Sequence, residues 1–193
     1  DTLSQLAQQF GVKLEELLKI NPEIDDPDLI YAGQTLKLPN SPSYHDSKAQ
    51  FSPSFLTAHR WVMENSSGEM STYYITPMEK YWLARIVHAE AKGEPFAGKV
   101  AVVHVILNRV RHEAFPDTIR EVIFQPGQFQ PVANGSIYQE PDDESVRAVE
   151  FALKTYGPED QNILYFYNPK IATSKWIFTR STVKVIGNHV FAR

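Results

Sequence analysis

A glutamate at the end of an apolar helix face is the first residue with catalytic potential. Glu90 continues a stripe with helical spacings of three and four, after Leu83, Ile86 and Val87. A carboxylate that points where apolar residues point loses water, so its charged form is disfavoured and its pKa rises. A raised pKa keeps a general acid protonated near neutral pH. The pattern by itself also allows the alternative that Glu90 lies at a solvated helix end or pairs with a neighbouring basic side chain.

Glu94 is the nearest second carboxylate. In a continuous helix it would lie one turn beyond Glu90, with Cβ atoms roughly 5–6 Å apart. That arrangement would permit a glycosidase that uses two carboxylates. Gly93 and Pro95 flank Glu94, however, and these residue types predict a loop. Glu94 is therefore expected to support Glu90 or to orient substrate, and the two-carboxylate alternative stays open.

Aromatic and amide side chains crowd the second half of the chain and are suited to a sugar-binding cleft. Aromatic rings stack on sugar faces, and amides bond hydroxyl and N-acetyl groups. Since alternate residues of a strand face the core, about half of these rings are expected to be buried. The candidate substrate-binding residues are Gln125, Gln128, Phe129, Tyr165, Tyr167, Asn168, Trp176 and His189.

Other catalytic chemistries find little support in the sequence. The histidines show no metal-ligand spacing, and His88 with Glu90 does not make the H-E-x-x-H pattern of a zinc helix. His104, inside an apolar helix, is expected to be a hydrogen-bonded core residue. There is no cysteine, no G-x-S-x-G motif and no phosphate-binding loop. We therefore predict no metal and no cofactor.

Composition and charge limit the partners. The net charge of −4 and the pI of about 5.9 give no electrostatic footprint for nucleic acid. No apolar run approaches the ~20 residues of a membrane span. We predict a monomer with no nucleic-acid partner and no membrane span. The chain opens on Asp1-Thr2-Leu3, which reads like the middle of a motif, so a signal peptide is expected upstream.

The elements that must position Glu90 are helices. Thr76-Pro77-Met78-Glu79 fits a capping box, which predicts a helix from Pro77 to about Ala91. A second helix is expected at about 97–111, buried nearly all round, and shorter or later helices at 118–124 and 144–156. Residues 125–135 are expected to form a loop.

The C-terminal segment changes to β-type residues. Strands are predicted at 163–167, 176–178, 183–186 and 189–191. Helices first and a small antiparallel sheet last make this domain α+β. We place its start at residue 76.

The first 75 residues divide into a small module and a linker. Residues 1–39 read as two short helices, 3–10 and 12–20, followed by a strand at 35–38. A core this small is marginal alone. Residues 40–75 read as a linker, with a short helix expected within 55–64.

Residues 1–39 resemble a LysM module. The resemblance rests on Asp1-Thr2-Leu3, on Asn21-Pro22 and on the run from Asp28 to Pro39. It implies a βααβ fold, with the first strand lying before Asp1, and binding of glycans that contain N-acetylglucosamine. The implied glycan-binding residues are Asp1, Thr2, Asp28, Leu29 and Ile30.

Residues from about 77 to 193 resemble the catalytic domain of the cell-wall hydrolases that include the spore cortex-lytic enzymes of Bacillus. The motifs are E-A-K-G-E-P at 90–95, G-K-V-A-V at 98–102, I-L-N-R-V at 106–110, V-I-F-Q-P-G-Q-F at 122–129, Y-F-Y-N-P at 165–169, T-S-K-W at 173–176 and I-G-N-H-V-F at 186–191. The resemblance implies a lysozyme-like fold. It also implies that the catalytic glutamate is the first of E-A-x-G-E, which falls on Glu90.

The function that this resemblance implies is cleavage of peptidoglycan between N-acetylmuramic acid and N-acetylglucosamine. The expected reaction is that of a lytic transglycosylase, which leaves 1,6-anhydromuramic ends. A hydrolytic muramidase using Glu90 and Glu94 is one alternative, and a non-catalytic wall-binding protein is another. The implied location is extracellular, in the cell wall or the spore cortex. Cortex enzymes often carry a different wall-binding repeat, so the choice between vegetative wall and cortex stays open.

Overall fold

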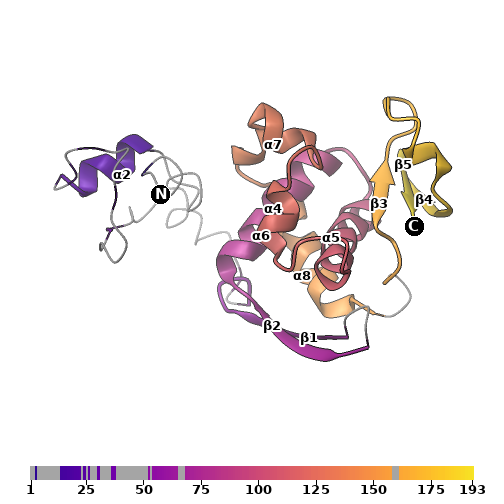
Figure 1. The fold of residues 1–193 in the computed structure, drawn as a ribbon, viewed down its shortest axis with the longest axis horizontal. Helices are drawn as coiled ribbons and strands as arrows, with labels where there is room; N and C mark the ends of the chain where they lie inside the picture. The colour runs from indigo at the N-terminus through magenta and orange to yellow at the C-terminus, as the bar shows by residue number, and fades with distance from the viewer. Residues whose placement is uncertain are drawn as a thin grey trace. The chain divides into compact units, whose positions relative to one another are not determined.

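The computed structural model of the protein describes residues 3, 14–22, 24, 26, 30, 36–37, 52, 54–64, 68–157 and 161–193. The chain divides into two compact units, Asp1–Phe51 and Ser52–Arg193. The first contains helix α2, and the second contains the remaining described helices and strands (Figure 1).

The first unit is organised around one short helix. α2 (Leu14–Ile20) confirms the predicted second helix and buries Leu17 against Leu3 and Ile24. Asn21 follows it and is fully buried. Its amide Nδ2 donates to the carbonyls of Leu17 at 2.7 Å and Lys37 at 2.6 Å, while its Oδ1 accepts from the Lys37 N–H at 2.7 Å. One side chain therefore joins the end of α2 to Lys37, in the segment for which a strand was predicted; of that segment only residues 36 and 37 are described, and they carry no strand.

Helix α4 (Pro77–Ala91) begins at the predicted capping box. The Glu79 N–H donates to Thr76 Oγ1 at 3.2 Å, and the Thr76 N–H donates to Glu79 Oε2 at 2.9 Å. Two backbone donors that have no partner within the helix are thereby satisfied. The helix ends at Ala91, and Gly93 takes φ of +85°, as the Gly-Pro signal predicted.

The other helices pack around α4 and around one another. α5 (Phe96–Arg111) is buried continuously from Gly98 to Val110, which confirms the prediction of a helix buried nearly all round. α5 packs against α4, α6 (Ile119–Phe124) and α8 (Asp143–Thr155). Thr118 and Asp142 cap α6 and α8 with their side-chain oxygens.

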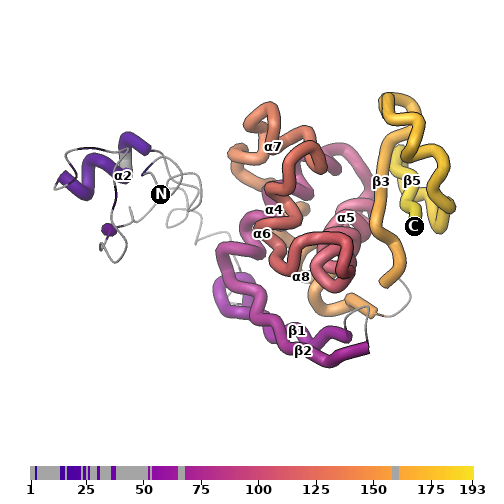
Figure 2. The backbone as a smooth tube through the Cα atoms, in the orientation of Figure 1, coloured from indigo at the N-terminus to yellow at the C-terminus, as the bar shows by residue number. Residues whose placement is uncertain are grey.

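The C-terminal sheet has three antiparallel strands in the order β3-β5-β4. They are β3 (Tyr165–Tyr167), β4 (Thr182–Ile186) and β5 (His189–Ala192). Figure 2 shows β3 running beside β5 at one edge of the helices. The predicted α+β class is confirmed, with β3 adjoining α5.

Two local predictions in this half were wrong. Within the expected 125–135 loop, helix α7 (Gln130–Asn134) forms, and the 3₁₀ turn η2 (Ser136–Tyr138) follows directly after it. The expected strand at 176–178 is instead the 3₁₀ turn η4 (Ile177–Thr179). The aromatic residues there resemble strand residues, but the segment makes a turn whose Thr179 N–H returns to the Trp176 carbonyl at 3.0 Å.

The expected short helix within 55–64 was also wrong. β1 (His59–Glu64) and β2 (Met70–Ile75) form an antiparallel hairpin instead. Trp61 is buried edge-on against Tyr156 at 5.3 Å, and Arg111 Nε donates to the Glu64 carbonyl at 2.8 Å. Alternation of buried and exposed residues in β1 is the strand period, which a short window of apolar residues does not distinguish from a helix.

The second unit therefore begins before the predicted boundary at residue 76. The ammonium of buried Lys80 on α4 donates to the carbonyls of Ser54 at 2.8 Å and Thr57 at 2.6 Å. Ser54 also donates to Glu150 on α8 at 2.7 Å. Residues in the second half of the expected linker thus belong to the helical unit by their hydrogen bonds.

Candidate active site

Glu90 occupies the last turn of α4. It follows the buried stretch from Lys80 to His88, and it is itself largely withdrawn from solvent. Burial raises the pKa of the Glu90 carboxyl to about 7, against the opposing effect of the positive charge on Arg109. A carboxyl with this pKa holds its proton about half of the time at neutral pH, so it can both give and take one.

Arg109 on α5 is held rigidly beside the site. Its Nε donates to the Leu164 carbonyl at 2.8 Å, just before β3. Its guanidinium carbon lies 5.0, 5.3 and 5.9 Å from three ring centroids, those of Phe115, Phe129 and Tyr165. Burial lowers the pKa of Arg109 to about 10, which leaves it charged at neutral pH. Its Nη1 is buried and makes no hydrogen bond within the part of the chain that the structure describes.

Glu94 has a different role from Glu90. Its two oxygens accept from the Asn188 N–H at 2.9 Å and from the Asn188 side-chain amide at 3.0 Å. Burial opposes ionisation slightly, but these hydrogen bonds and the charges of His189 and Lys170 lower the pKa of Glu94. Glu94 thus stays ionised and fastens the β4–β5 turn to the loop after α4.

Gly187 allows this close contact. It adopts φ of +59°, and a Cβ at this position would lie 2.1 Å from Glu94 Oε2 and 2.6 Å from Pro95 Cδ. Only a glycine combines this left-handed conformation with such proximity. The I-G-N-H motif therefore positions the turn against Glu94.

Strand β3 divides the predicted aromatic residues between two sides. Phe166 packs against Phe129, Phe191 and His189. Tyr165 meets Trp176 edge-on at 5.2 Å, and Tyr167 meets Phe178 edge-on at 5.3 Å. All three β3 rings are half-buried, so the two sides of the strand differ in their neighbours and not in a clean alternation of core and exposed rings.

Two candidate substrate-binding residues are buried. Phe129 is 4% exposed and His189 is 6% exposed, and both pack against Phe166. Rings this enclosed offer little free face to a sugar, and contact of Phe129 and His189 with substrate stays a prediction. Burial also lowers the pKa of His189, with the Glu94 charge acting in the opposite direction.

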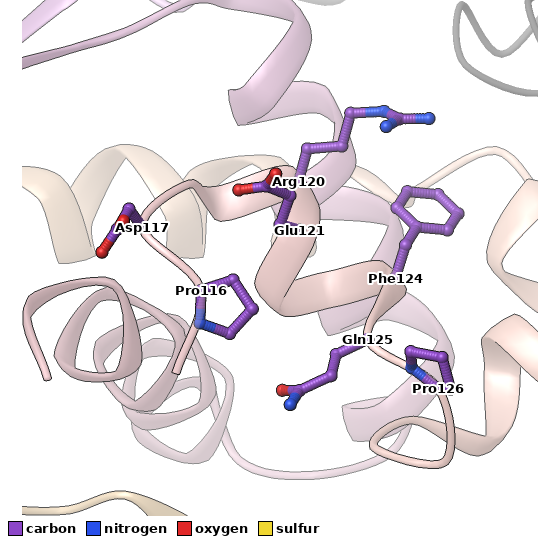
Figure 3. Close-up of a pocket in the computed structure, with 7 residues that line it drawn as sticks. All are labelled: Pro116, Asp117, Arg120, Glu121, Phe124, Gln125 and Pro126. Atoms are coloured by element: carbon purple, nitrogen blue, oxygen red, sulfur yellow. The ribbon is translucent and has the colours of Figure 1, made fainter. Parts of the chain in front are cut away.

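The amide candidates lie on turns. Gln125 ends α6 and lines a surface pocket of about 490 Å³ with Pro116, Asp117, Arg120, Glu121, Phe124 and Pro126 (Figure 3). Gln128 is exposed, and its N–H donates to the Gln125 carbonyl at 3.2 Å. Asn168 shapes the turn after β3, since its Oδ1 accepts from the Lys170 N–H at 3.0 Å. Glu90 is not among the residues that line the Figure 3 pocket.

The predicted glycan-binding residues of the first unit fall mostly outside the described residues. Asp1, Thr2, Asp28 and Leu29 lie there. Ile30 is described, and its side chain packs partly buried against the small core.

Sequence reasoning missed Arg109 and Asn188 as site residues. Arg109 interrupts an otherwise apolar helical stripe, and a basic residue in such a stripe needs a partner, which was an available signal. Asn188 had no comparable signal, because its partner Glu94 lies 94 positions away in the chain.

Two absences hold for the residues that the structure describes. No group of three or more His, Asp or Glu side chains there has the arrangement to hold a metal ion. No helix among them is both long and apolar enough to cross a membrane. His104 is a core residue as predicted, with Nε2 3.2 Å from the Ala152 carbonyl.

Similar proteins share this second unit. A spore cortex-lytic enzyme of Oceanobacillus iheyensis is 48% identical over 111 residues, which cover 58% of this chain and 40% of that protein. One from Bacillus cereus is 47% identical over 111 residues, covering 42% of its length. The chain thus spans about two fifths of the length of these relatives.

Two solved structures are similar to the second unit of this chain. The catalytic domain of the germination-specific lytic transglycosylase SleB from Bacillus anthracis superposes with a TM-score of 0.56 at 45% identity, covering 60% of this chain and 93% of that domain. The catalytic domain of the Bacillus cereus SleB protein gives a TM-score of 0.55 at 44% identity.

Family comparisons assign both units. Residues 1–39 match the LysM domain, and residues 93–192 match the family described as Cell Wall Hydrolase. Glu90 lies just before the second match, on the helix that leads into it. With half of its length in that match, this chain belongs to the Cell Wall Hydrolase family and carries an N-terminal LysM domain.

Proposed function

We propose that this protein cleaves the glycan strands of peptidoglycan between N-acetylmuramic acid and N-acetylglucosamine, as a lytic transglycosylase. The observation that carries the proposal is the half-buried Glu90 carboxyl, whose pKa is raised to about 7 while Glu94 stays bound to Asn188. One carboxyl that can act first as acid and then as base suits this reaction. The name of the similar solved domain, a germination-specific lytic transglycosylase, supports the same reaction.

The proposed reaction has two steps. Glu90 gives its proton to the glycosidic oxygen, the bond from that oxygen to muramic C1 breaks, and positive charge develops at C1. The muramic C6 hydroxyl then attacks C1 and gives its proton to the Glu90 carboxylate. The products are a 1,6-anhydromuramic end and a free N-acetylglucosamine hydroxyl, and Glu90 is protonated again.

Arg109 has a defined part in this scheme. After the first step Glu90 carries a negative charge, and the fixed positive charge of Arg109 stabilises it. Because Arg109 is already held by Leu164 and three rings, little reorganisation is needed when the charge appears.

Substitution of Glu90 tests the proposal. Glu90→Gln removes the proton donor while keeping shape, so cleavage of purified sacculi should fall about a thousandfold or more. Turbidity loss measures the rate, and circular dichroism checks that the variant is folded. Near-normal cleavage by folded Glu90→Gln would refute the assignment, and a wild-type protein that binds sacculi without cutting them would support the non-catalytic alternative.

The products distinguish the transglycosylase from a hydrolytic muramidase. A muramidase needs a second carboxylate at retaining or inverting distance, and Glu94 is occupied by Asn188. Mass spectrometry of digested peptidoglycan should therefore find anhydromuramic ends. Reducing muramic ends in their place would overturn this part of the proposal.

The LysM domain is proposed to hold the enzyme on its substrate. LysM resemblance implies binding of N-acetylglucosamine-containing glycans through Asp1, Thr2, Asp28, Leu29 and Ile30. We accordingly place the protein outside the cell, in the cell wall or the spore cortex. Product analysis on cortex and vegetative peptidoglycan side by side decides between these two substrates.

A further inference from the structure

Two exposed rings lie along one side of strand β3. Trp176 is 50% exposed and Phe178 is 48% exposed, in contrast to the buried rings around Phe166. Each meets the edge of a different β3 tyrosine, Tyr165 or Tyr167. These tyrosines are two residues apart on a strand, so they are spaced by about 7 Å. The exposed rings therefore occupy two successive positions along the strand.

The rings are held in place before any ligand arrives. The Arg180 guanidinium carbon lies 4.7 Å from the Trp176 ring centroid. Thr179 donates from both its N–H, at 3.0 Å, and its hydroxyl, at 2.7 Å, to the Trp176 carbonyl, which closes the turn between the rings. A ring fixed in advance loses little conformational entropy on binding.

This pair of rings connects to the catalytic position. Tyr165, which holds Trp176, is also one of the rings around Arg109, with 5.9 Å from its centroid to the guanidinium carbon. Arg109 in turn acts electrostatically on Glu90. The exposed rings are thus linked, through Tyr165 and Arg109, to the group that acts on Glu90.

The charge around the rings is positive, although the whole protein carries −4. From position 161 to the C-terminus the sequence has no Asp or Glu, and its five basic residues are Lys170, Lys175, Arg180, Lys184 and Arg193. Lys170 and Lys175 are exposed on the segment that carries the rings. Lys170 also donates to Asn188 Oδ1 at 3.3 Å, near the Glu94 carboxylate. Such a surface complements an acidic partner.

We propose that Trp176 and Phe178 form a stacking platform for two neighbouring sugars, and that the basic residues beside it select glycan strands that carry carboxylates. The muramic residues of peptidoglycan carry a lactyl carboxylate or an acidic peptide, whereas chitin has the same N-acetylglucosamine backbone without them. The inference rests on the proposed function, because it places the platform on the glycan cut at Glu90.

A binding experiment on the full chain tests this platform. The catalytically silenced Glu90→Gln protein is titrated with two soluble probes, a peptidoglycan tetrasaccharide that keeps its lactyl carboxylates and a chitin tetrasaccharide. Binding is followed through the indole N–H signals in NMR. The chain has three tryptophans, Trp61, Trp82 and Trp176, and none lies in residues 1–39, so sugar bound to LysM contributes little. Trp61 and Trp82 are buried, which leaves Trp176 as the responsive probe.

The expected result has three parts. The Trp176 signal moves with both sugars, and the carboxylate-bearing sugar binds more tightly at low salt. The Lys170→Gln, Lys175→Gln double variant binds the carboxylate-bearing sugar about threefold more weakly, and its affinity for the chitin sugar is unchanged. The Phe178→Ala variant binds both sugars about fivefold more weakly.

Two outcomes would overturn the inference. If the chemical shift of the Trp176 indole N–H does not change at saturating sugar, the stacking platform is refuted. If the lysine double variant loses the same affinity for both sugars, the selection by charge is refuted. Neither outcome touches the proposed function, which is tested separately by cleavage of sacculi and by the products of that cleavage.

Discussion

At the scale of single residues, two carboxylates four positions apart have opposite chemistry because their surroundings differ. Burial raises the pKa of Glu90, whereas hydrogen bonds from Asn188 hold that of Glu94 below its ordinary value. The first can exchange a proton near neutral pH, and the second remains an acceptor that fixes structure.

Arg109 is predicted to control the ionisation of Glu90. Arg109→Met removes the charge that favours the Glu90 carboxylate, so the pKa of Glu90 should rise by about one unit or more. Since the acid form starts the reaction, the alkaline limb of the pH–rate profile should move upward while the maximal rate falls. The profile on soluble glycan and a ¹³C NMR titration of the Glu90 carboxyl both measure this.

Arg109→Lys is the matched control. It keeps the charge but loses the planar group that lies among three rings. The alkaline limb of the pH–rate profile of Arg109→Lys should stay near that of the wild type. If Arg109→Met lost activity with no shift of the limb, Arg109 would be a structural residue only.

Glu90 should also cost stability above neutral pH. Its folded pKa of about 7 exceeds the ordinary 4.5, so the folded state binds more protons between these values and loses stability as the pH rises through them. Glu90→Gln should therefore stabilise the protein by about 2–3 kcal/mol at pH 8 and by little at pH 4. Urea unfolding at both pH values measures the difference, and equal effects at the two would contradict the assigned burial.

At the scale of elements, the site depends on a turn fastened to a loop. Glu94, Gly187 and Asn188 join the end of α4 to the β4–β5 turn. Without these hydrogen bonds, the sheet that carries Tyr165 would lose a contact with the loop that follows the Glu90 helix.

Glu94→Gln is predicted to keep most of the activity while lowering stability. The amide retains one acceptor oxygen for Asn188 but loses the charge, so cleavage should stay within about threefold of wild type. The pKa of Glu94 is lowered in the folded state, so its stabilising effect is present at neutral pH and disappears as the pH falls through that value. Thermal unfolding at pH 7 should show a lower Tm for the variant, and the difference should shrink as the pH is lowered into the acid range. A loss of cleavage comparable to that of Glu90→Gln would revive the two-carboxylate mechanism.

At the scale of the whole molecule, the LysM match and the Cell Wall Hydrolase match fall in separate compact units. The first unit, Asp1–Phe51, has a small core, and Asn21 holds its helix end to Lys37 with three hydrogen bonds. A unit of this size has little stability to lose.

Asn21→Ala should disrupt the first unit selectively. It leaves the backbone groups of Lys37 and the Leu17 carbonyl without their partner, at a cost of about 2 kcal/mol or more. The variant should bind sacculi more weakly yet cleave soluble glycan at the wild-type rate. Co-sedimentation and a soluble-substrate assay measure the two properties, and equal losses in both would show that the units do not act separately.

The sequence by itself determined the local features. The capping box at Thr76 and the Gly-Pro stop bounded α4, the helical period placed Glu90 on its apolar face, and the family motifs identified both units. These features are local because capping, turn chemistry and periodicity depend on residues within a few positions of one another.

Only the tertiary structure decided which residues act together. Glu94 meets Asn188 from 94 positions away, Arg109 meets the carbonyl of Leu164 from 55 away, and β1 pairs with β2 where a helix was expected. The same packing buried Phe129 and His189 and left Trp176 exposed, although all three had looked alike as cleft residues. Local patterns could not separate them, because the exposure of an aromatic ring depends on which distant elements cover it.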